Sequence, residues 1–274
     1  MSINSVSLSA AARNNLTTLQ NVAQLLQTTQ GHLATGKKVN SASDNANAFF
    51  ASQGFLNRAN DLANLKNNLS NSLQTVTSVN NSISNVTTIV TQLQGITTQA
   101  LGTSSTATRA GLASQFNSLL TQLDLLVNDA TFNGTNLLNS TSNNLVVFFN
   151  ETNTTSLTIG GVNILSTGLG VSAASGAFSD TTKINTSASL LLTALSTLRT
   201  DAANFGGNAT LIQTRQDFTT NLINSLQTAS DNLVLADTNQ EGANLQALQA
   251  QNQLGIVALG ISGQLAQAVL RLFP

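Results

Sequence analysis

Several residue types that would point to a particular chemistry are rare or absent in this 274-residue chain. It contains no cysteine, tryptophan or tyrosine, one histidine, and one proline, which is the last residue. Without cysteine there is neither a disulfide nor a reactive thiol. The cysteine content therefore does not indicate whether the protein works in an oxidising or a reducing compartment. Because no proline interrupts the interior, long helices are permitted. Charged residues make up 8% and the net charge is −1, which argues against nucleic acid and anionic membranes as partners.

Two kinds of segment are missing as well. The first residues, Met1 to Ser7, have neither a basic start nor an apolar run, so they do not form a cleaved signal peptide. No apolar run approaches the ~18 residues that a membrane span needs. We therefore expect no membrane insertion, and export, if it occurs, without a cleaved leader.

The ionisable side chains do not form a recognisable catalytic or metal-binding pattern. His32 is the only histidine, and without cysteine a zinc site would need several carboxylates around it. The segment 168–173 matches a G-x-G-x-x-A fragment, but no strong helix follows it, and we interpret it as a glycine-rich loop. The sequence thus predicts no enzyme, no metal and no cofactor.

The strongest periodic signal lies between about residues 58 and 101. Apolar residues alternate three and four apart, which predicts a helix buried along one seam and on the order of 65 Å long. The two rows are Leu62, Leu69, Val76, Ile83, Val90 and Leu65, Val79, Val86, Leu93, Ala100. Between Lys66 and Arg109 there is no charge, so the outer face can pack against neighbours without burying one.

Both chain ends show thinner seams of the same kind. Residues 5–34 carry the row Ala12, Leu19, Leu26, Leu33, with Leu16 and Ala23 behind it. The C-terminal region carries the row Leu226, Leu233, Gln240, Ala247, Leu254, Ile261, Ala268 and a partner row Ala229, Ala236, Ala243, Ala250, Val257. Each helix alone is marginal in water, so we expect the two to pair. The residues expected to pack between terminal helices or between subunits are Leu16, Leu19, Leu26, Leu33, Leu254, Val257, Ile261, Leu265 and Leu272.

A break separates the first helix from the long one at residues 34–48. Gly36 is expected to end the first helix, and Ser43 or Asp44 to cap the next. Lys37, Lys38 and Asp44 bring rare charge together here. On physical grounds alone, this segment is either a capped joint between helices or a functional motif.

The middle of the chain changes period. A return helix follows the turn at 102–107, and then an Asn133-Gly134 turn, a strand at 145–149 and a hairpin at 157–165 are expected, with Gly160-Gly161 as its tight turn. Residues 166–182 read as loop. From about residue 183 a helix returns with the row Leu191, Leu198, Phe205, Ile212, which Gly206-Gly207 should interrupt or kink. The predicted fold class is mainly α, an elongated antiparallel coiled-coil or helical bundle with a small β-hairpin element and pairing terminal helices.

Three segments resemble bacterial flagellin. Residues 33–48 are similar to the family's signature around its first helix break, 131–138 to the Phe-Asn-Gly-x-x-Leu-Leu run, and 246–272 to its C-terminal helix. The signature residues here are Gly36, Lys37, Asn40, Ser41 and Asp44. Asn45 departs from the pattern, since a second acidic residue is usual there.

The resemblance implies a filament subunit. Residues 1–45 and 238–274 would form the inner tube and 46–237 the outer tube, with the β element at about 131–180 and no further outer domains. The subunit would be exported by the flagellar type III apparatus, polymerise with itself, and meet an export chaperone, the flagellar cap and the hook–filament junction proteins. It would lie outside the cell and serve motility.

The resemblance also bears on innate recognition. The family's epitope for the flagellin-sensing Toll-like receptor lies at the end of the long helix and on the return helix. Gln92, Gln94 and Gly95 stand where Arg, Arg and Glu are expected, Ile96 replaces Leu, and Gln115 lies near a second expected Glu. Because charge-assisted bonds are lost, we expect weak or no recognition.

Two alternatives remain open at this point. A hook–filament junction protein shares the terminal helices but would not grow long filaments alone. A coiled-coil surface adhesin would form a stable monomer or closed oligomer with ordered termini. Hydrogen exchange at the chain ends separates the adhesin from the filament subunit.

Overall fold

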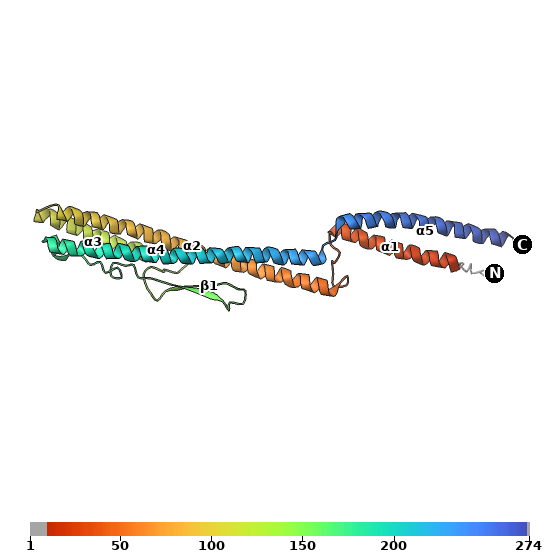
Figure 1. Ribbon diagram of the computed structural model, residues 1–274, viewed down its shortest axis with the longest axis horizontal. Helices are drawn as coiled ribbons and strands as arrows, with labels where there is room; N and C mark the ends of the chain where they lie inside the picture. The colour runs from red at the N-terminus through yellow and green to blue at the C-terminus, as the bar shows by residue number, and fades with distance from the viewer. Residues whose placement is uncertain (1–9, 273–274) are drawn as a thin grey trace. The chain divides into compact units, whose positions relative to one another are not determined.

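The structure is a computed structural model that describes residues 10–272, with the side chains of 266 and 269–272 left aside. Its described elements are α1 (Ala10–Thr35), α2 (Ala46–Leu101), α3 (Thr106–Asp129), β1 (Asn144–Phe148), β2 (Ser156–Gly160), the short 3₁₀ helix η1 (Ser175–Phe178), α4 (Thr181–Val234) and α5 (Thr238–Leu272) (Figure 1). The predicted class, mainly α with a small β-hairpin, is confirmed.

The chain forms two compact units. The first contains the described residues up to Arg58 and from Ser225 onward, and the second runs from Ala59 to Asn224. The first unit therefore holds α1, α5 and the adjoining turns of α2 and α4. The second holds the rest of α2 and α4 with α3, η1 and the sheet.

The second unit is built on the predicted seams. Every member of the two α2 rows is buried, with Leu69, Val76 and Val90 at 0% exposure. On α4, Leu191, Leu198 and Ile212 are also at 0%. Apolar spacing of three and four residues thus placed one face of each helix in a common core, while the polar face stayed outside.

A pair of aromatic rings joins α3 to the segment before α4. The rings of Phe116 and Phe178 meet edge to face, with centroids 5.4 Å apart and planes at 76°. Both side chains are fully buried. Asp124 of α3 accepts hydrogen bonds from the Ser166 amide at 2.6 Å and from its hydroxyl at 2.7 Å. Residues 166–182 were expected to be loop, but they contain η1 and the first two residues of α4. The part before α4 is tied to α3 by these contacts.

The Asn133-Gly134 turn is confirmed. Both residues have positive φ, 50° and 79°, which is the geometry of a type I′ turn. Phe132 and Thr135 exchange backbone hydrogen bonds of 2.9 and 3.0 Å across it.

The position of the hairpin was predicted wrongly. β1 pairs with β2, with Val146 opposite Thr158, so the turn lies at residues 149–155. Gly160 ends the second strand and Gly161 follows it. The Asn150 side chain accepts from the amides of Thr154 and Thr155 and shapes that longer loop. Gly161 serves close packing instead, because a Cβ there would lie 2.5 Å from the Ser140 carbonyl oxygen.

The expected interruption at Gly206-Gly207 does not occur, since α4 is one helix from Thr181 to Val234. Two glycines cost roughly 2 kcal/mol of helix propensity. Phe205 and Ile212, buried on either side of them, stabilise the helical path by more than that. Within residues 10–272, none of the helices combines the length and the hydropathy that a bilayer crossing requires.

Replacing Phe178 with alanine should strongly destabilise the second unit. The change leaves a cavity beside Phe116 and should cost about 3–5 kcal/mol of unfolding free energy. Phe218 is 59% exposed and provides the matched control, for which Phe218→Ala should cost less than about 0.5 kcal/mol. Urea unfolding followed by circular dichroism measures both. Equal losses for the two variants would contradict the role given to the ring pair.

Candidate assembly site

The terminal helices α1 and α5 pack against each other within the first unit (Figure 1). On α1, Ala12, Val22 and Thr29 are buried and Leu19, Leu26 and Leu33 are partly buried. The row of Ala12, Leu19, Leu26 and Leu33 is thus confirmed as the inner one. The row behind it was predicted wrongly, because Leu16 is 38% exposed and Ala23 is also exposed. Val22 and Thr29 take that place, since they continue the alternation of three and four from the leucines.

The face of α5 that meets α1 is not the face expected. Leu245, Leu248, Asn252 and Gly255 are partly buried. A Cβ on Gly255 would lie 2.8 Å from Cδ2 of Leu19, so the Leu19 side chain occupies the space above that glycine. Close approach therefore comes from a glycine opposite a leucine and not from the predicted alanine row.

The predicted packing residues of α5 lie on its exposed face. The exposed fractions are 70% for Leu254, 59% for Val257, 53% for Ile261 and 63% for Leu265. Leu272 has a side chain outside those that the structure describes. Spacings of three and four residues place the other four on one stripe, which we call the outer row of α5. Exposed large apolar groups in such a stripe are typical of an interaction surface.

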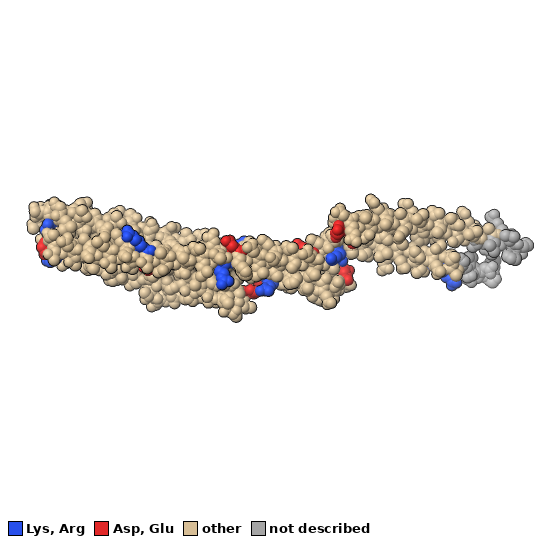
Figure 2. Space-filling model, in the orientation of Figure 1, with Lys and Arg blue, Asp and Glu red and all other residues tan. Residues whose placement is uncertain are grey.

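Charge is scarce around this stripe. From Gly242 to Leu270 the sequence carries no charged residue. The face drawn in Figure 2 is correspondingly almost free of charged side chains over α5. A partner could therefore cover the outer row without burying an unpaired charge.

A backbone joint connects the terminal helices to their neighbours in the first unit. Gly36 has φ 70° and ends α1 as expected. The backbones of Lys37 and Leu235 form an isolated antiparallel β-bridge. On either side of it, the Lys38 amide donates to the Val234 carbonyl at 2.8 Å, and the Ala236 amide donates to the Gly36 carbonyl at 3.0 Å. Two connections that are remote in sequence thus run antiparallel for a few residues.

Asp44 organises the turn that follows. One carboxylate oxygen accepts from the amides of Asn40 and Ser41, both at 2.9 Å, and from the Ser41 hydroxyl at 3.2 Å. These backbone hydrogen bonds, that from Asn40 first, lower the pKa of Asp44 from its ordinary 3.8. Asn40 also donates to the Lys37 carbonyl at 3.1 Å. The structure therefore brings the signature residues together in one turn.

The predicted helix cap is corrected. Helix α2 begins at Ala46, and the Ala48 amide donates to Oδ1 of Asn45 at 3.0 Å. Asn45 is therefore the capping residue, and neither Ser43 nor Asp44 is. Asn45 directly precedes the helix, whereas Oδ2 of Asp44 accepts three hydrogen bonds from the preceding turn.

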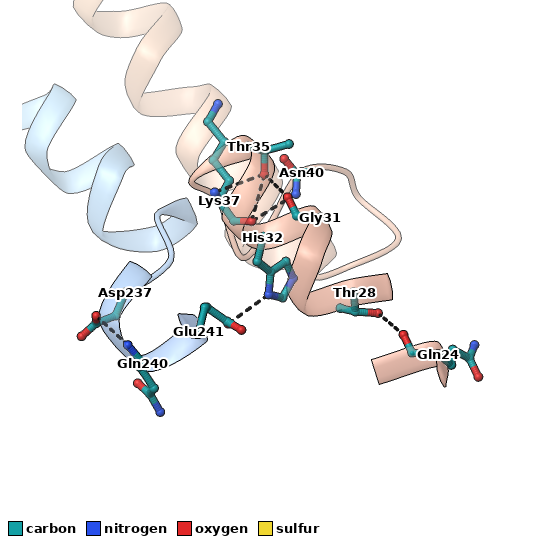
Figure 3. Close-up of polar contacts among 10 residues, drawn as sticks. All are labelled: Gln24, Thr28, Gly31, His32, Thr35, Lys37, Asn40, Asp237, Gln240 and Glu241. Carbon is teal, nitrogen blue, oxygen red and sulfur yellow. Dashed lines mark hydrogen bonds and ion pairs between the residues drawn. The ribbon is translucent and has the colours of Figure 1, made fainter. Parts of the chain in front are cut away.

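His32 and Glu241 form a contact that the sequence did not reveal (Figure 3). Nδ1 of His32 lies 3.0 Å from Oε1 of Glu241, and the two side chains are 20% and 17% exposed. They are separated by 209 residues in the chain, so no local pattern could have paired them. Among the described residues there is no group of three or more His, Cys, Asp and Glu side chains that could hold a metal ion.

The residues expected to alter receptor recognition lie in the second unit. Gln92, Gly95 and Gln115 are exposed, and Gln94 is partly buried. Ile96 is only 7% exposed and belongs to the core of the bundle. It therefore does not present its side chain to a partner as a surface leucine would.

Paired terminal helices with an apolar outer row, joined to a helical bundle with a small sheet, define a self-associating structural subunit. Residues 6–143 match the family model for the bacterial flagellin N-terminal helical region. The chain belongs to the bacterial flagellin family.

Individual relatives agree over the full length. The chain is 30% identical over 274 residues to flagellin FljN of Caulobacter vibrioides and 29% identical to flagellin FljO, with 100% of each chain covered. It is 28% identical over 286 residues to a flagellin of Brucella melitensis, covering 98% of this chain and 99% of that one. A solved structure of Bacillus cereus flagellin is similar to 56% of this chain and 88% of its own, at 16% identity and a TM-score of 0.49.

The Asp44 turn should lose stability in acid. Because the folded pKa lies below 3.8, the carboxylate contributes stability above the unfolded pKa, and this is lost as pH falls through the folded value. In a carbon-detected NMR titration, the Asp44 carboxyl should have its midpoint at a pH below 3.8 in the folded chain and at a pH near 3.8 in urea. Asp44→Asn should speed amide exchange at Asn40 and Ser41. A folded midpoint at or above 3.8 would contradict the assignment.

Proposed function

We propose that this chain is a structural subunit that polymerises with itself into the extracellular filament of the bacterial flagellum and so serves motility. The single observation that carries the proposal is the outer row of α5. This apolar stripe contains no charged residue, and none of the described residues covers it. Flagellin relatives are structural proteins, in agreement with this role.

The proposed architecture assigns residues 1–45 and 238–274 to an inner tube and 46–237 to an outer tube. The pairing of α1 with α5 supports this division, because it leaves one apolar stripe facing away from the pair. When such a stripe meets a different surface of the next copy, the contact does not close, and an open helical polymer results.

We further propose export through the flagellar type III apparatus without a cleaved leader, with a chaperone, the cap and the junction proteins as partners. The composition supports this route. A chain without cysteine or internal proline can pass through a narrow channel extended and fold afterwards without slow isomerisation. Thinly apolar termini gain order from partners instead of from themselves.

Polar substitution in the outer row should impair polymerisation. Leu254→Gln with Leu265→Gln is expected to raise the critical concentration about tenfold per leucine, since burying one such side chain is worth roughly 1.5–3 kcal/mol. Sedimentation and electron microscopy of seeded protein measure this. Leu192, exposed by 63% like Leu265, lies on α4 and supplies the control Leu192→Gln, which should leave the critical concentration within about twofold.

Two outcomes of that experiment would contradict the proposal. If the doubly substituted chain polymerises like the unsubstituted one, the outer row is not an assembly surface. If the unsubstituted chain forms no long filaments on its seeds, a junction protein becomes the better assignment.

Receptor recognition should be weak and should return when charge is restored. Replacing Gln92 and Gln94 with arginine and Gly95 with glutamate rebuilds the charged groups that the family's epitope offers. A reporter cell line carrying the flagellin-sensing Toll-like receptor should respond to the substituted monomer at least about tenfold more strongly. Gln99→Arg, an exposed position farther along α2, is the control for added charge. Potent activation by the unsubstituted monomer would refute this proposal.

A further inference from the structure

We propose that His32 and Glu241 set the register in which α1 pairs with α5, and thereby the position of the outer row. This inference rests on the proposed function, because the register matters once subunits assemble.

Two contacts define the register observed between the helices. Leu19 lies over Gly255, and His32 meets Glu241, so the two helices run antiparallel. A slip of one heptad, about 10 Å, would move Leu19 from Gly255 to Leu248. That leucine already belongs to the face of α5 turned toward α1, so the slipped helices would still match apolar with apolar groups, although they would lose the close approach that Gly255 allows.

The charged contact does distinguish the two registers. In the observed register the Glu241 carboxylate lies 3.0 Å from Nδ1 of His32 at 17% exposure. After the slip Glu241 would face Leu25, which is 54% exposed, and its carboxylate would exchange the bond to His32 for water. The slipped register would therefore lose the contact that the observed register makes. Because charged residues are rare in both helices, this contact can specify how the two helices align.

The backbone joint works in the same direction. The Ala236 amide and the Gly36 carbonyl are bonded at 3.0 Å, only a few residues from His32 and Glu241. The joint holds the ends of the two helices together, and the charged contact fixes their alignment about one turn further along. Figure 3 shows His32 and Glu241 pointing toward each other from α1 and α5.

Disulfide trapping can read the register directly, because the natural chain has no cysteine. Leu19→Cys with Gly255→Cys reports the observed register, and Leu19→Cys with Leu248→Cys reports the slipped one. Each pair is placed in the full chain, copolymerised with an excess of cysteine-free chain and oxidised mildly. Since the neighbours carry no thiol, any disulfide is intramolecular, and mass spectrometry of the digested filament gives the yields.

Three sequence backgrounds test the charged contact. His32→Glu puts two carboxylates together, Glu241→His puts two imidazoles together, and the combination of both restores the pair in exchanged positions. The ratio of observed to slipped yield should fall about tenfold in each single variant and return to the original value in the combination. If a single variant fails to enter filaments and the combination enters them again, that result also supports the role of the contact in setting the register.

Other outcomes would overturn the inference. If both single variants keep the original ratio, the register does not depend on the charged contact. If the combination behaves like the single variants, in ratio or in failure to enter filaments, the residues act through size or packing. Absence of filaments from the cysteine-free chain itself would instead count against the proposed function, and so the two failures can be told apart.

Discussion

The pairing of α1 with α5 is the interaction on which the proposed assembly of this chain depends. Its seam consists of leucines separated by small or polar residues such as Ala12, Thr29, Asn252 and Gly255. Burial of this kind yields little free energy against the entropy of ordering two helices. The outer row of α5 faces away from this seam. A pair that is incompletely satisfied alone and apolar outside is well suited to gain its stability from further copies.

The second unit follows the opposite design. Its helices bury complete rows of large side chains, and the Phe116–Phe178 ring pair and the Asp124–Ser166 hydrogen bonds tie the connecting segments to α3. The chain thus combines a unit with a closely packed core and a terminal helix pair that presents an apolar row on its outside.

The scarcity of charge links both units to the same role. Uncharged Asn, Ser, Thr and Gln cover the helices, and many threonine hydroxyls donate to the carbonyl four residues earlier, as Thr77 does to Leu73. These side chains satisfy their own hydrogen-bonding groups locally. A surface of this kind can be packed against another copy with little cost in desolvated charge. The few contacts that involve a charged group, such as that of His32 with Glu241, can then specify how helices align.

What the sequence by itself determined was the helical material and the buried rows of the second unit, because apolar spacing of three and four residues has one interpretation over many turns. The Asn133-Gly134 turn and the stop at Gly36 followed equally from local conformational preference. The tertiary structure decided which face of α5 meets α1, which turn closes the hairpin, and that α4 continues through Gly206-Gly207. These depend on contacts between residues far apart in the chain, where packing outweighs local preference, and a one-dimensional pattern does not record them.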